Sequence, residues 1–276
     1  MKIITNTAAL FRPEDGKKLG INIIPVSISV LNRTFRDYLD IDPDRLLDFL
    51  RKKETPVSSQ PALGDVLDLL EDTDDETIML TVADGLSGEY MTAMGVRNTL
   101  PNKEKIHIIN SGSLGAPLHY MALKAAQMRD QGCPANEIVA RITSCVRSSL
   151  SFVIPADFQY LKRSGRINEI TSRIGSALKL LPVLTQSEDR RRISVMTVRR
   201  TWKSAISSVV ERMKEAGVNE KYLVSVSYAD KKELAQQVLR QIREVFPGSD
   251  NELVQLAPSL ITHGGPGCIV VQAVEK

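Results

Sequence analysis

The chain has few of the residues around which catalytic and metal sites are usually built. Its 276 residues include three cysteines and three histidines. The cysteines are far apart and form no Cys-x-x-Cys pair, which fits a reducing compartment, so we expect a cytoplasmic protein. The histidines form no His-Glu-x-x-His motif and do not cluster with cysteines at ligand spacing, so we expect no metal site.

Signatures of nucleotide binding and of membrane insertion are also missing. The chain has neither the Gly-x-x-x-x-Gly-Lys-Ser/Thr loop nor the Gly-x-Gly-x-x-Gly turn, so we expect no nucleotide cofactor. Its first residues lack the basic stretch and long apolar core of a secretory signal, and we expect no signal peptide. No run of about 18 apolar residues occurs, so we also expect no transmembrane segment.

The first part of the chain alternates strand-like and helix-like stretches. Strand-like runs cover residues 1–5, 21–30, 77–82 and 106–109, and helix-like stretches cover 43–50, 63–70, 116–130 and 135–148. Asp42 and Pro43 are typical of a helix N-cap and first helical residue. The continuous apolar run 77–82 is typical of a strand buried on both faces. This alternation predicts an N-terminal α/β/α domain with a parallel sheet over residues 1–150.

After residue 150 the pattern favours a different kind of sheet. Residues 192–198 alternate between apolar and polar side chains, as in a sheet with one solvated face. We expect amphipathic helices at about 201–216 and 231–245. Six stretches resemble strands: 151–155, 182–187, 193–198, 222–228, 252–257 and 268–274. The prediction is a C-terminal α/β domain, residues 151–276, with a mixed, largely antiparallel six-stranded sheet.

Two hydroxyl side chains stand side by side in the stretch Pro56-Val57-Ser58-Ser59-Gln60-Pro61. A proline two residues after Ser59 suits the first turn of a helix, so Ser59 is predicted to cap a helix. The unpaired N–H groups and positive dipole at a helix start can also hold a carboxylate or phosphate. Capping alone is the commoner role, and both roles stay open on this stretch.

Another hydroxyl, Ser87, stands in a glycine turn after the strand-like run 77–82. Ligands of open α/β sheets bind at the carboxyl ends of strands, so Ser87 is a candidate ligand contact as well as a candidate cap. It is a poor candidate for a hydrolase nucleophile. The sequence Gly85-Leu86-Ser87-Gly88-Glu89 departs from Gly-x-Ser-x-Gly, and the sequence places no histidine beside it.

A glycine-rich stretch, Thr262-His263-Gly264-Gly265-Pro266-Gly267, precedes the last strand-like run and predicts a tight, exposed turn. Glycine lets a ligand approach the backbone closely, and His263 could donate a hydrogen bond to an anion there. A lone histidine in a loop is as often merely solvated, so both interpretations stay open.

Basic residues are concentrated between positions 160 and 203. This stretch has eleven lysines and arginines against three acidic residues, although the whole chain carries a net charge of only +3. The asymmetry indicates an acidic partner or an anionic ligand, with a solvated basic face as the alternative for about half of these residues. Only Tyr160 and Trp202 are aromatic in this stretch, too few for base stacking, so we expect no nucleic-acid partner.

Five short motifs in one order resemble those of the DegV family of fatty-acid-binding proteins, and the similarity covers essentially the whole chain. The motifs are Val-Ser-Ser-Gln-Pro (57–61), Leu-Ser-Gly-Glu-Tyr (86–90), Tyr-Leu-Lys-Arg-Ser-Gly-Arg-Ile (160–167), Leu-Lys-Leu-Leu-Pro-Val-Leu (178–184) and His-Gly-Gly-Pro-Gly (263–267). The resemblance implies two domains with one long-chain fatty acid bound in a tunnel between them, and no enzymatic activity of the chain itself.

The resemblance also implies a role for individual residues. The hydroxyls of the first two motifs would bind the fatty-acid carboxylate, and the histidine loop and a downstream arginine would lie near it; the implied ligand residues are Ser58, Ser87, Gly88, His263, Gly264, Gly265 and Arg200. The protein would present the carboxylate to a separate ATP-dependent fatty acid kinase. That kinase would dock on the basic stretch at Lys162, Arg163 and Arg166, and transient contact with a membrane is also implied.

Several residues depart from the family pattern. Thr5-Asn6-Thr7 stands where the family has Asp-Ser-Thr, and Glu89 replaces a threonine. Asp84 replaces one of two serines, so two acidic side chains stand close to the implied carboxylate site. A like charge within about 4–6 Å would oppose binding of an anion. Asp84 and Glu89 therefore either point away, or one is protonated, or the ligand differs from an ordinary fatty acid.

Three hypotheses follow from the sequence. The first is a non-catalytic lipid carrier that binds a long-chain fatty acid and passes it to a kinase. The second is an enzyme, either a serine hydrolase or a phosphotransfer enzyme acting on a small hydroxylated substrate. The third is a regulatory or nucleic-acid-binding module, which would bind DNA in a salt-dependent way. The missing nucleophile motif and nucleotide loop disfavour the second, and the motif resemblance favours the first.

Overall fold

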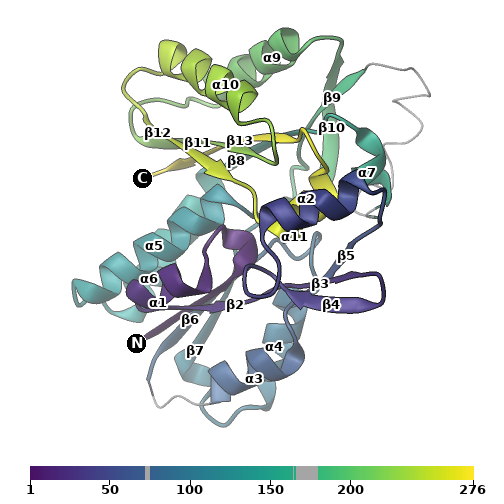
Figure 1. Ribbon diagram of the computed structural model, residues 1–276. Coiled ribbons are helices and arrows are strands. Elements are labelled where there is room, and N and C mark those ends of the chain that lie inside the picture. The colour runs from purple at the N-terminus through teal and green to yellow at the C-terminus, as the bar shows by residue number, and fades with distance from the viewer. Residues whose placement is uncertain (72–74, 164, 166–179) are drawn as a thin grey trace.

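The structure is a computed structural model, and it describes residues 1–71, 75–163, 165 and 180–276. A parallel sheet and a larger mixed sheet are the main features of this part of the chain (Figure 1). The parallel sheet has the order β2-β1-β6-β7, built from Lys2–Asn6 (β1), Ile21–Ile24 (β2), Thr77–Thr81 (β6) and Ile106–Asn110 (β7). The parallel sheet predicted for the first part of the chain is therefore confirmed.

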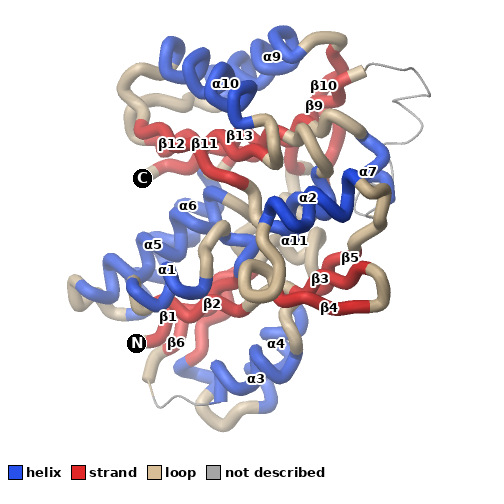
Figure 2. The backbone as a smooth tube through the Cα atoms, in the orientation of Figure 1, coloured by secondary structure: helices blue, strands red, loops and turns tan. Residues whose placement is uncertain are grey.

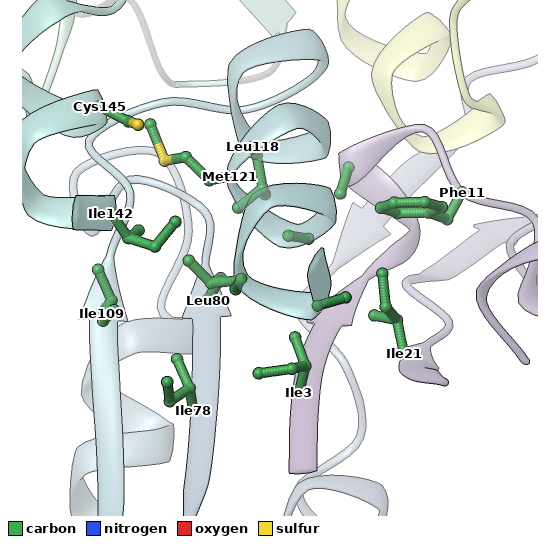
Figure 3. Close-up of a cluster of buried hydrophobic side chains, with 14 of the residues drawn as sticks. Ile3, Phe11, Ile21, Ile78, Leu80, Ile109, Leu118, Met121, Ile142 and Cys145 are labelled. Atoms are coloured by element: carbon green, nitrogen blue, oxygen red, sulfur yellow. The ribbon is translucent and has the colours of Figure 1, made fainter. Parts of the chain in front are cut away.

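Both faces of the parallel sheet are covered by helices because its strands are apolar on both sides. Successive side chains of a strand point to opposite faces. Ile3 accordingly packs in one hydrophobic cluster, with residues of α5 (Ala116–Asp130) and α6 (Ala135–Ser148), as Figure 3 shows. Its neighbour Ile4 packs in another cluster, with residues of α3 (Leu63–Glu71) and α4 (Glu89–Thr99). The expected α/β/α arrangement is confirmed, and a short helix, α1 (Pro13–Lys18), packs beside β2.

The mixed sheet has the order β10-β9-β8-β13-β11-β12. All neighbouring strands in it are antiparallel except β11 and β12. The strands are Leu150–Ile154 (β8), Leu181–Gln186 (β9), Ile193–Arg199 (β10), Tyr222–Tyr228 (β11), Asp250–Gln255 (β12) and Ile269–Glu275 (β13). The prediction of a mixed, largely antiparallel six-stranded sheet is confirmed, and each strand lies within two residues of its expected position.

The helices α5 and α6 lie between the two large sheets (Figure 2). On one side they contact the parallel sheet, and on the other both contact β13 of the mixed sheet. Val274 of β13 accordingly belongs to the same hydrophobic cluster as Ile3 and Leu118. The outer face of the mixed sheet is covered by α9 (Trp202–Glu215) and α10 (Lys232–Val245), so the two sheets share one layer of helices.

A third, small sheet was not predicted. It is antiparallel, with the order β4-β3-β5, and its strands are Ser27–Val30 (β3), Arg33–Arg36 (β4) and Val57–Ser59 (β5). The strand-like run 21–30 is divided at Pro25, which has no N–H group to donate to a ladder. Its two halves therefore belong to different sheets.

The predicted helix cap at Ser59 is wrong. Ser59 is the last residue of β5 and pairs with Ser27 of β3, and the following helix, α3, begins at Leu63. The helix start expected at Asp42 is confirmed, because the Asp42 side chain accepts a hydrogen bond from the Arg45 backbone N–H and Pro43 is the first residue of α2 (Pro43–Arg51). The remaining elements of the described residues are α7 (Phe158–Arg163), α11 (Pro258–Gly264) and the 3₁₀ turns at Thr7–Ala9 and Lys103–Lys105.

Candidate functional site

A pocket lies where the parallel-sheet and mixed-sheet halves meet the small sheet. It encloses about 900 Å³ of space between atoms, part of it open to solvent. Its walls come from both halves of the chain, including Val82 after β6, Val153 of β8, Ile193 of β10 and Val270 of β13. The described polar side chains in its walls are Asn6, Ser58, Ser59, Gln60, Ser87, Glu89, Ser259 and His263. The pocket is thus mainly apolar with a limited set of polar groups, as is usual for ligand sites.

Ser58 and His263 meet in the wall of this pocket, although they are far apart in the sequence. The Ser58 hydroxyl oxygen lies 2.7 Å from Nε2 of His263. Ser58 is held in β5 by pairing with Ile28, and His263 lies in the last turn of α11, which packs on β5. If Nε2 donates to the Ser58 oxygen, the Ser58 hydroxyl hydrogen remains available to a ligand.

Ser87 lies just before α4, whose N-cap is Gly88, and not Ser87 as one of its two predicted roles required. Its hydroxyl oxygen accepts a hydrogen bond of 3.2 Å from the backbone N–H of Glu89. Gly88 separates the two, and a side chain at Gly88 would collide with the carboxamide of Gln60, which also lines the pocket. Because Ser87 accepts with its oxygen, its hydroxyl hydrogen can be donated into the pocket.

Glu89 is a buried carboxyl group in the pocket wall. It is 1% exposed, and Oε2 accepts hydrogen bonds from Asn6 Nδ2 at 2.6 Å and from the Val82 backbone N–H at 3.0 Å. Burial raises the pKa of Glu89 to about 7, and the bonds from Asn6 and Val82 act in the opposite direction. Near neutral pH this carboxyl therefore exists in both its protonated and its ionised form.

Asp84, the other acidic departure from the family pattern, is neutralised by a partner. Its Oδ2 lies 3.2 Å from Nε of Arg191, in the turn between β9 and β10. Asp84 does not belong to the described lining of the pocket. Of the two acidic side chains singled out in the sequence, only Glu89 therefore belongs to the described lining of this pocket.

The glycine-rich stretch is not the exposed turn that the sequence predicted. His263 and Gly264 form the end of α11, and Gly264, Gly265 and Gly267 are buried. Gly265 has a φ of +72°, and a side chain there would overlap the ring of Tyr160 on α7. The stretch is buried because α7 packs against α11, so close packing as well as ligand access calls for glycine here.

The basic residues between 160 and 203 do not form one uniform face. Arg190 donates hydrogen bonds to the backbone oxygens of Arg147 and Ser149, at 2.6 and 2.8 Å, and so satisfies the end of α6. Arg191 pairs with Asp84. Arg200 is exposed in the turn before α9 and is not part of the described pocket lining, so its contact with a head group stays a prediction.

Two of the predicted docking residues, Lys162 and Arg163, directly follow Leu161 of the pocket wall. Lys162 and Arg163 are exposed in the last turn of α7, and the Arg163 guanidinium lies 4.7 Å from the centre of the Tyr160 ring. Arg166 lies outside the described residues. The role of these three residues in docking stays a prediction.

Sequence reasoning did not assign a role to two other polar residues of the pocket, Gln60 and Ser259. Gln60 donates to the Thr92 hydroxyl at 2.8 Å and so joins β5 to α4. Ser259 lies against Asp37, a second buried carboxyl, whose pKa burial raises to about 6 while Ser259 and Thr7 act in the opposite direction. Nothing in the local sequence indicates these contacts, because Asp37 and Ser259 are brought together only by the packing of distant elements.

The described part of the chain contains neither a candidate metal site nor a candidate membrane-spanning helix. No group of three or more His, Cys, Asp and Glu side chains there is arranged to hold a metal ion. No described helix is long and apolar enough to cross a membrane.

A parallel sheet and a mixed sheet that share a helical layer define a two-sheet α/β protein, and the mainly apolar pocket at their junction is its candidate ligand site. The chain belongs to the DegV family, because the model of that family, described as "Uncharacterised protein, DegV family", matches residues 1–276. A DegV domain-containing protein of Clostridium acetobutylicum is 27% identical over 278 residues, which cover 98% of this chain and 95% of that protein. One of Staphylococcus aureus strain N315 is 24% identical, covering 99% of this chain and 98% of its own.

Solved structures share the fold over the whole chain. DegV of Bacillus subtilis, described as a fatty acid binding protein, has a TM-score of 0.86 at 23% identity and covers 100% of this chain and 99% of its own. A stearic acid-binding protein of Eubacterium ventriosum has a TM-score of 0.87 at 20% identity, covering 100% and 98%. A DegV family protein of Eubacterium eligens, described as loaded with heptadecanoic acid, has a TM-score of 0.86 at 22% identity, covering 100% of each chain. The family resemblance drawn from the five motifs is confirmed.

Proposed function

We propose that the chain binds one long-chain fatty acid in the pocket between its two halves and has no catalytic step of its own. The observation that carries this proposal is the composition of the pocket: apolar side chains from both sheets, with hydroxyl, imidazole and carboxyl groups among them. Relatives with the same fold are described as binding fatty acids, which supports the same ligand class here. A chain of about 15 methylenes, at about 0.8 kcal/mol each, would contribute more than about 10 kcal/mol before binding costs.

The head group of the lipid belongs at the polar side chains, because a buried carboxylate without partners is very unfavourable. The hydroxyls of Ser58 and Ser87 and the imidazole of His263 are the proposed donors. Gly88, Gly264 and Gly265 belong to the same proposed site through the family resemblance. The space that a side chain would occupy at each of them is filled by Gln60, Cys268 and Tyr160, and of the three only Gly264 lines the pocket.

The proposal extends to a partner. The bound lipid is presented to a separate ATP-dependent fatty acid kinase, which docks through Lys162, Arg163 and Arg166. The two described residues of this set are exposed on α7, whose Leu161 lines the pocket, and this supports a docking surface next to the pocket. The three free cysteines suit a reducing compartment, and we propose that the exchange takes place in the cytoplasm.

The proposal is tested by extracting lipid from the purified protein. The protein is denatured, and the extract is analysed by mass spectrometry; the expected result is a long-chain fatty acid in an amount close to that of the protein. The same extraction from an unrelated protein purified in parallel controls for lipid carried over from the cells. A protein that is empty and also fails to take up added palmitic acid would contradict the proposal.

Ser58→Ala tests the polar end of the pocket. Removing a hydrogen bond to a charged group costs about 1.5–3 kcal/mol, so palmitate should bind roughly 10-fold to 100-fold more weakly. Ser207→Ala is the matched control, because Ser207 is exposed on α9 and is not in the described pocket lining. Equal affinity of the two variants for palmitate, measured by fluorescence competition, would remove Ser58 from the head-group site.

One observation favours a second candidate function, ester hydrolysis. The 2.7 Å contact between Ser58 and His263 is also the geometry of a nucleophile and its general base. Serine-hydrolase activity would appear as turnover of a long-chain p-nitrophenyl ester that is lost in Ser58→Ala. We expect no turnover by the wild-type protein, and activity that depends on Ser58 would favour the enzyme over the carrier.

A further inference from the structure

Glu89 has one carboxylate oxygen that the fold does not use. Oε2 accepts both available hydrogen bonds, from Asn6 of β1 and from the Val82 N–H after β6. Oε1 is buried and has no hydrogen-bond partner among the described residues. The side chain is 1% exposed and belongs to the wall of the apolar pocket. A buried polar oxygen without a partner is unfavourable, so this atom is left for a group that the pocket receives.

The groups around Glu89 do not supply a compensating positive charge. Asn6 and Ser87 are neutral, and the described residues form no ion pair with Glu89. Arg191, the nearest arginine of the β9–β10 turn to this loop, pairs with Asp84.

The other titratable side chains of the described pocket wall come from α11 and the residue before β13. They are His263, bonded to Ser58, and Cys268, whose pKa burial raises to about 12 so that it remains a neutral thiol. No described residue of α3 or β7, the other neighbours of α4, belongs to the pocket wall. Glu89 therefore takes up a proton more readily than an exposed glutamate does.

A fatty-acid anion would bring a second carboxylate into the pocket that holds Glu89. Two carboxylates in one poorly solvated site do not both ionise; they titrate as a pair that retains one proton. We propose that Glu89 determines which head groups the pocket accepts: it requires a head group that donates a hydrogen bond to Oε1, and a fatty acid binds with one proton held between its carboxyl and that of Glu89. This inference rests on the proposed lipid-binding function.

When both carboxyls are ionised before they meet, the proton comes from a buffer acid in the solvent: its bond to the buffer breaks and an O–H bond to one of the two carboxyls forms. A long-chain alcohol carries its own O–H donor and needs no added proton. A fatty-acid methyl ester has no donor and would leave Oε1 unsatisfied. Palmitic acid, 1-hexadecanol and methyl palmitate, which share a 16-carbon chain, therefore separate the head-group requirement from chain binding.

The test is calorimetric titration of the full chain with each lipid, in two buffers of different ionisation enthalpy, which gives the number of protons taken up. With a Glu89 pKa of about 7, palmitate binding should take up about 0.1 proton at about pH 6 and about 0.9 proton at about pH 8. Hexadecanol should bind with no uptake at either pH. At about pH 8, where Glu89 is mostly ionised, methyl palmitate should bind at least about 10-fold more weakly than hexadecanol, because it leaves a buried acceptor unpaired.

Glu89→Gln is the informative variant. Its amide oxygen can accept the bonds from Asn6 and Val82, and its NH₂ group then replaces Oε1 and donates to a carboxylate. Proton uptake at about pH 8 should fall close to zero, and palmitate affinity at that pH should rise about 10-fold. Glu104→Gln, at an exposed glutamate outside the described pocket lining, should behave as the wild type.

Two results would overturn the role of Glu89. One is palmitate binding without proton uptake at about pH 8, or with the same uptake in Glu89→Gln, which would assign the proton to another group such as His263. The other needs no variant: equal affinity of the wild-type protein for methyl palmitate and hexadecanol at about pH 8. Failure to bind any of the three lipids would instead overturn the lipid-binding function itself.

Discussion

The side chains at the polar end of the pocket line its walls and also form hydrogen bonds with neighbouring residues of the site. Ser58 bonds to His263, and Ser87 accepts a hydrogen bond from the N–H of Glu89. These bonds fix the positions of two hydroxyl oxygens. The Ser87 hydrogen is left to be donated, and so is the Ser58 hydrogen when Nε2 of His263 is the donor. A preorganised donor loses less side-chain entropy when a ligand arrives, which favours binding.

Glu89 should also make the stability of the protein depend on pH. Its pKa is raised from 4.5 to about 7 in the folded state, so the neutral form is favoured by folding. The contribution of Glu89 to the free energy of unfolding is therefore fully present below about pH 4.5. It falls as the pH rises towards about 7 and stays low above that. Ionising such a carboxyl in the fold costs about 3 kcal/mol.

Urea unfolding of the wild type and of Glu89→Gln, at a series of pH values, measures this effect. The variant should be more stable above about pH 7, by up to about 3 kcal/mol, and the difference should disappear near pH 4. Asp37, also buried with a raised pKa, contributes a similar slope to both proteins and cancels in the comparison. A difference that is the same at every pH would show that the effect comes from packing.

For single residues, the sequence predicted which side chains form the site better than it predicted the contacts of those side chains. Ser58, Ser87 and His263 were predicted from motifs, and all three line one pocket. For Asp84 the sequence left open whether it points away, is protonated or implies another ligand; in the structure Arg191 pairs with it from more than a hundred residues further along the chain. A sequence shows which side chains carry charge, whereas their pairing depends on the folded arrangement.

Among the elements, the β9–β10 hairpin connects the two halves of the molecule. Its turn holds the end of α6 through Arg190 and the loop after β6 through Arg191. Gln186 of β9 also donates to the Gly112 backbone oxygen at 2.5 Å. Gly85 allows the close approach, because a side chain there would overlap the Arg191 carbonyl group.

Gly85→Ala should therefore destabilise the protein. The added methyl group meets backbone atoms, which cannot move aside as the end of a side chain can, and overpacking of this kind costs about 1–3 kcal/mol. Gly95→Ala is the matched control: within α4, no described atom outside its own helix turn lies within 4 Å of the added methyl, so this variant should be more stable by about 0.5–1 kcal/mol. Urea midpoints measure both, and a neutral Gly85→Ala would contradict the contact.

The elements that the sequence predicted well are those with long regular patterns. The six strands of the mixed sheet and the helices α5, α6, α9 and α10 were all expected near their observed bounds. The small sheet was missed because its strands are only three or four residues long. Two serines followed by a proline suit a helix start, and they suit the end of a short strand equally well. The local sequence does not separate these two cases, and Ser59, which ends β5, was therefore assigned to a helix start.

For the molecule as a whole, the main feature that the sequence did not reveal is the layer of helices shared by the two large sheets. The predicted boundary near residue 150 separates two patterns of sequence, and this division stays a prediction. The helices α5 and α6 precede that boundary and yet pack on β13 of the mixed sheet. Each half would expose part of this apolar layer if the other unfolded.

We therefore expect one cooperative unfolding transition. Trp202, the only tryptophan, lies at the start of α9 and reports on the mixed-sheet half, whereas far-ultraviolet circular dichroism reports on all helices and strands. Urea unfolding curves from the two probes should coincide. A tryptophan transition clearly separated from the dichroism transition would show that the halves unfold independently.

The position of β13 also constrains when the protein can fold during synthesis. This strand follows all other described strands in the chain, yet it lies between β8 and β11 in the middle of the mixed sheet. Until the ribosome has delivered it, β8 and β11 lack the partner that joins them, and the outward face of α5 and α6 lacks part of its cover. Such long-range pairing is slow to form and leaves apolar surface exposed meanwhile. The two sides of the mixed sheet, β10-β9-β8 and β11-β12, can therefore join only once β13 is available to pair with both.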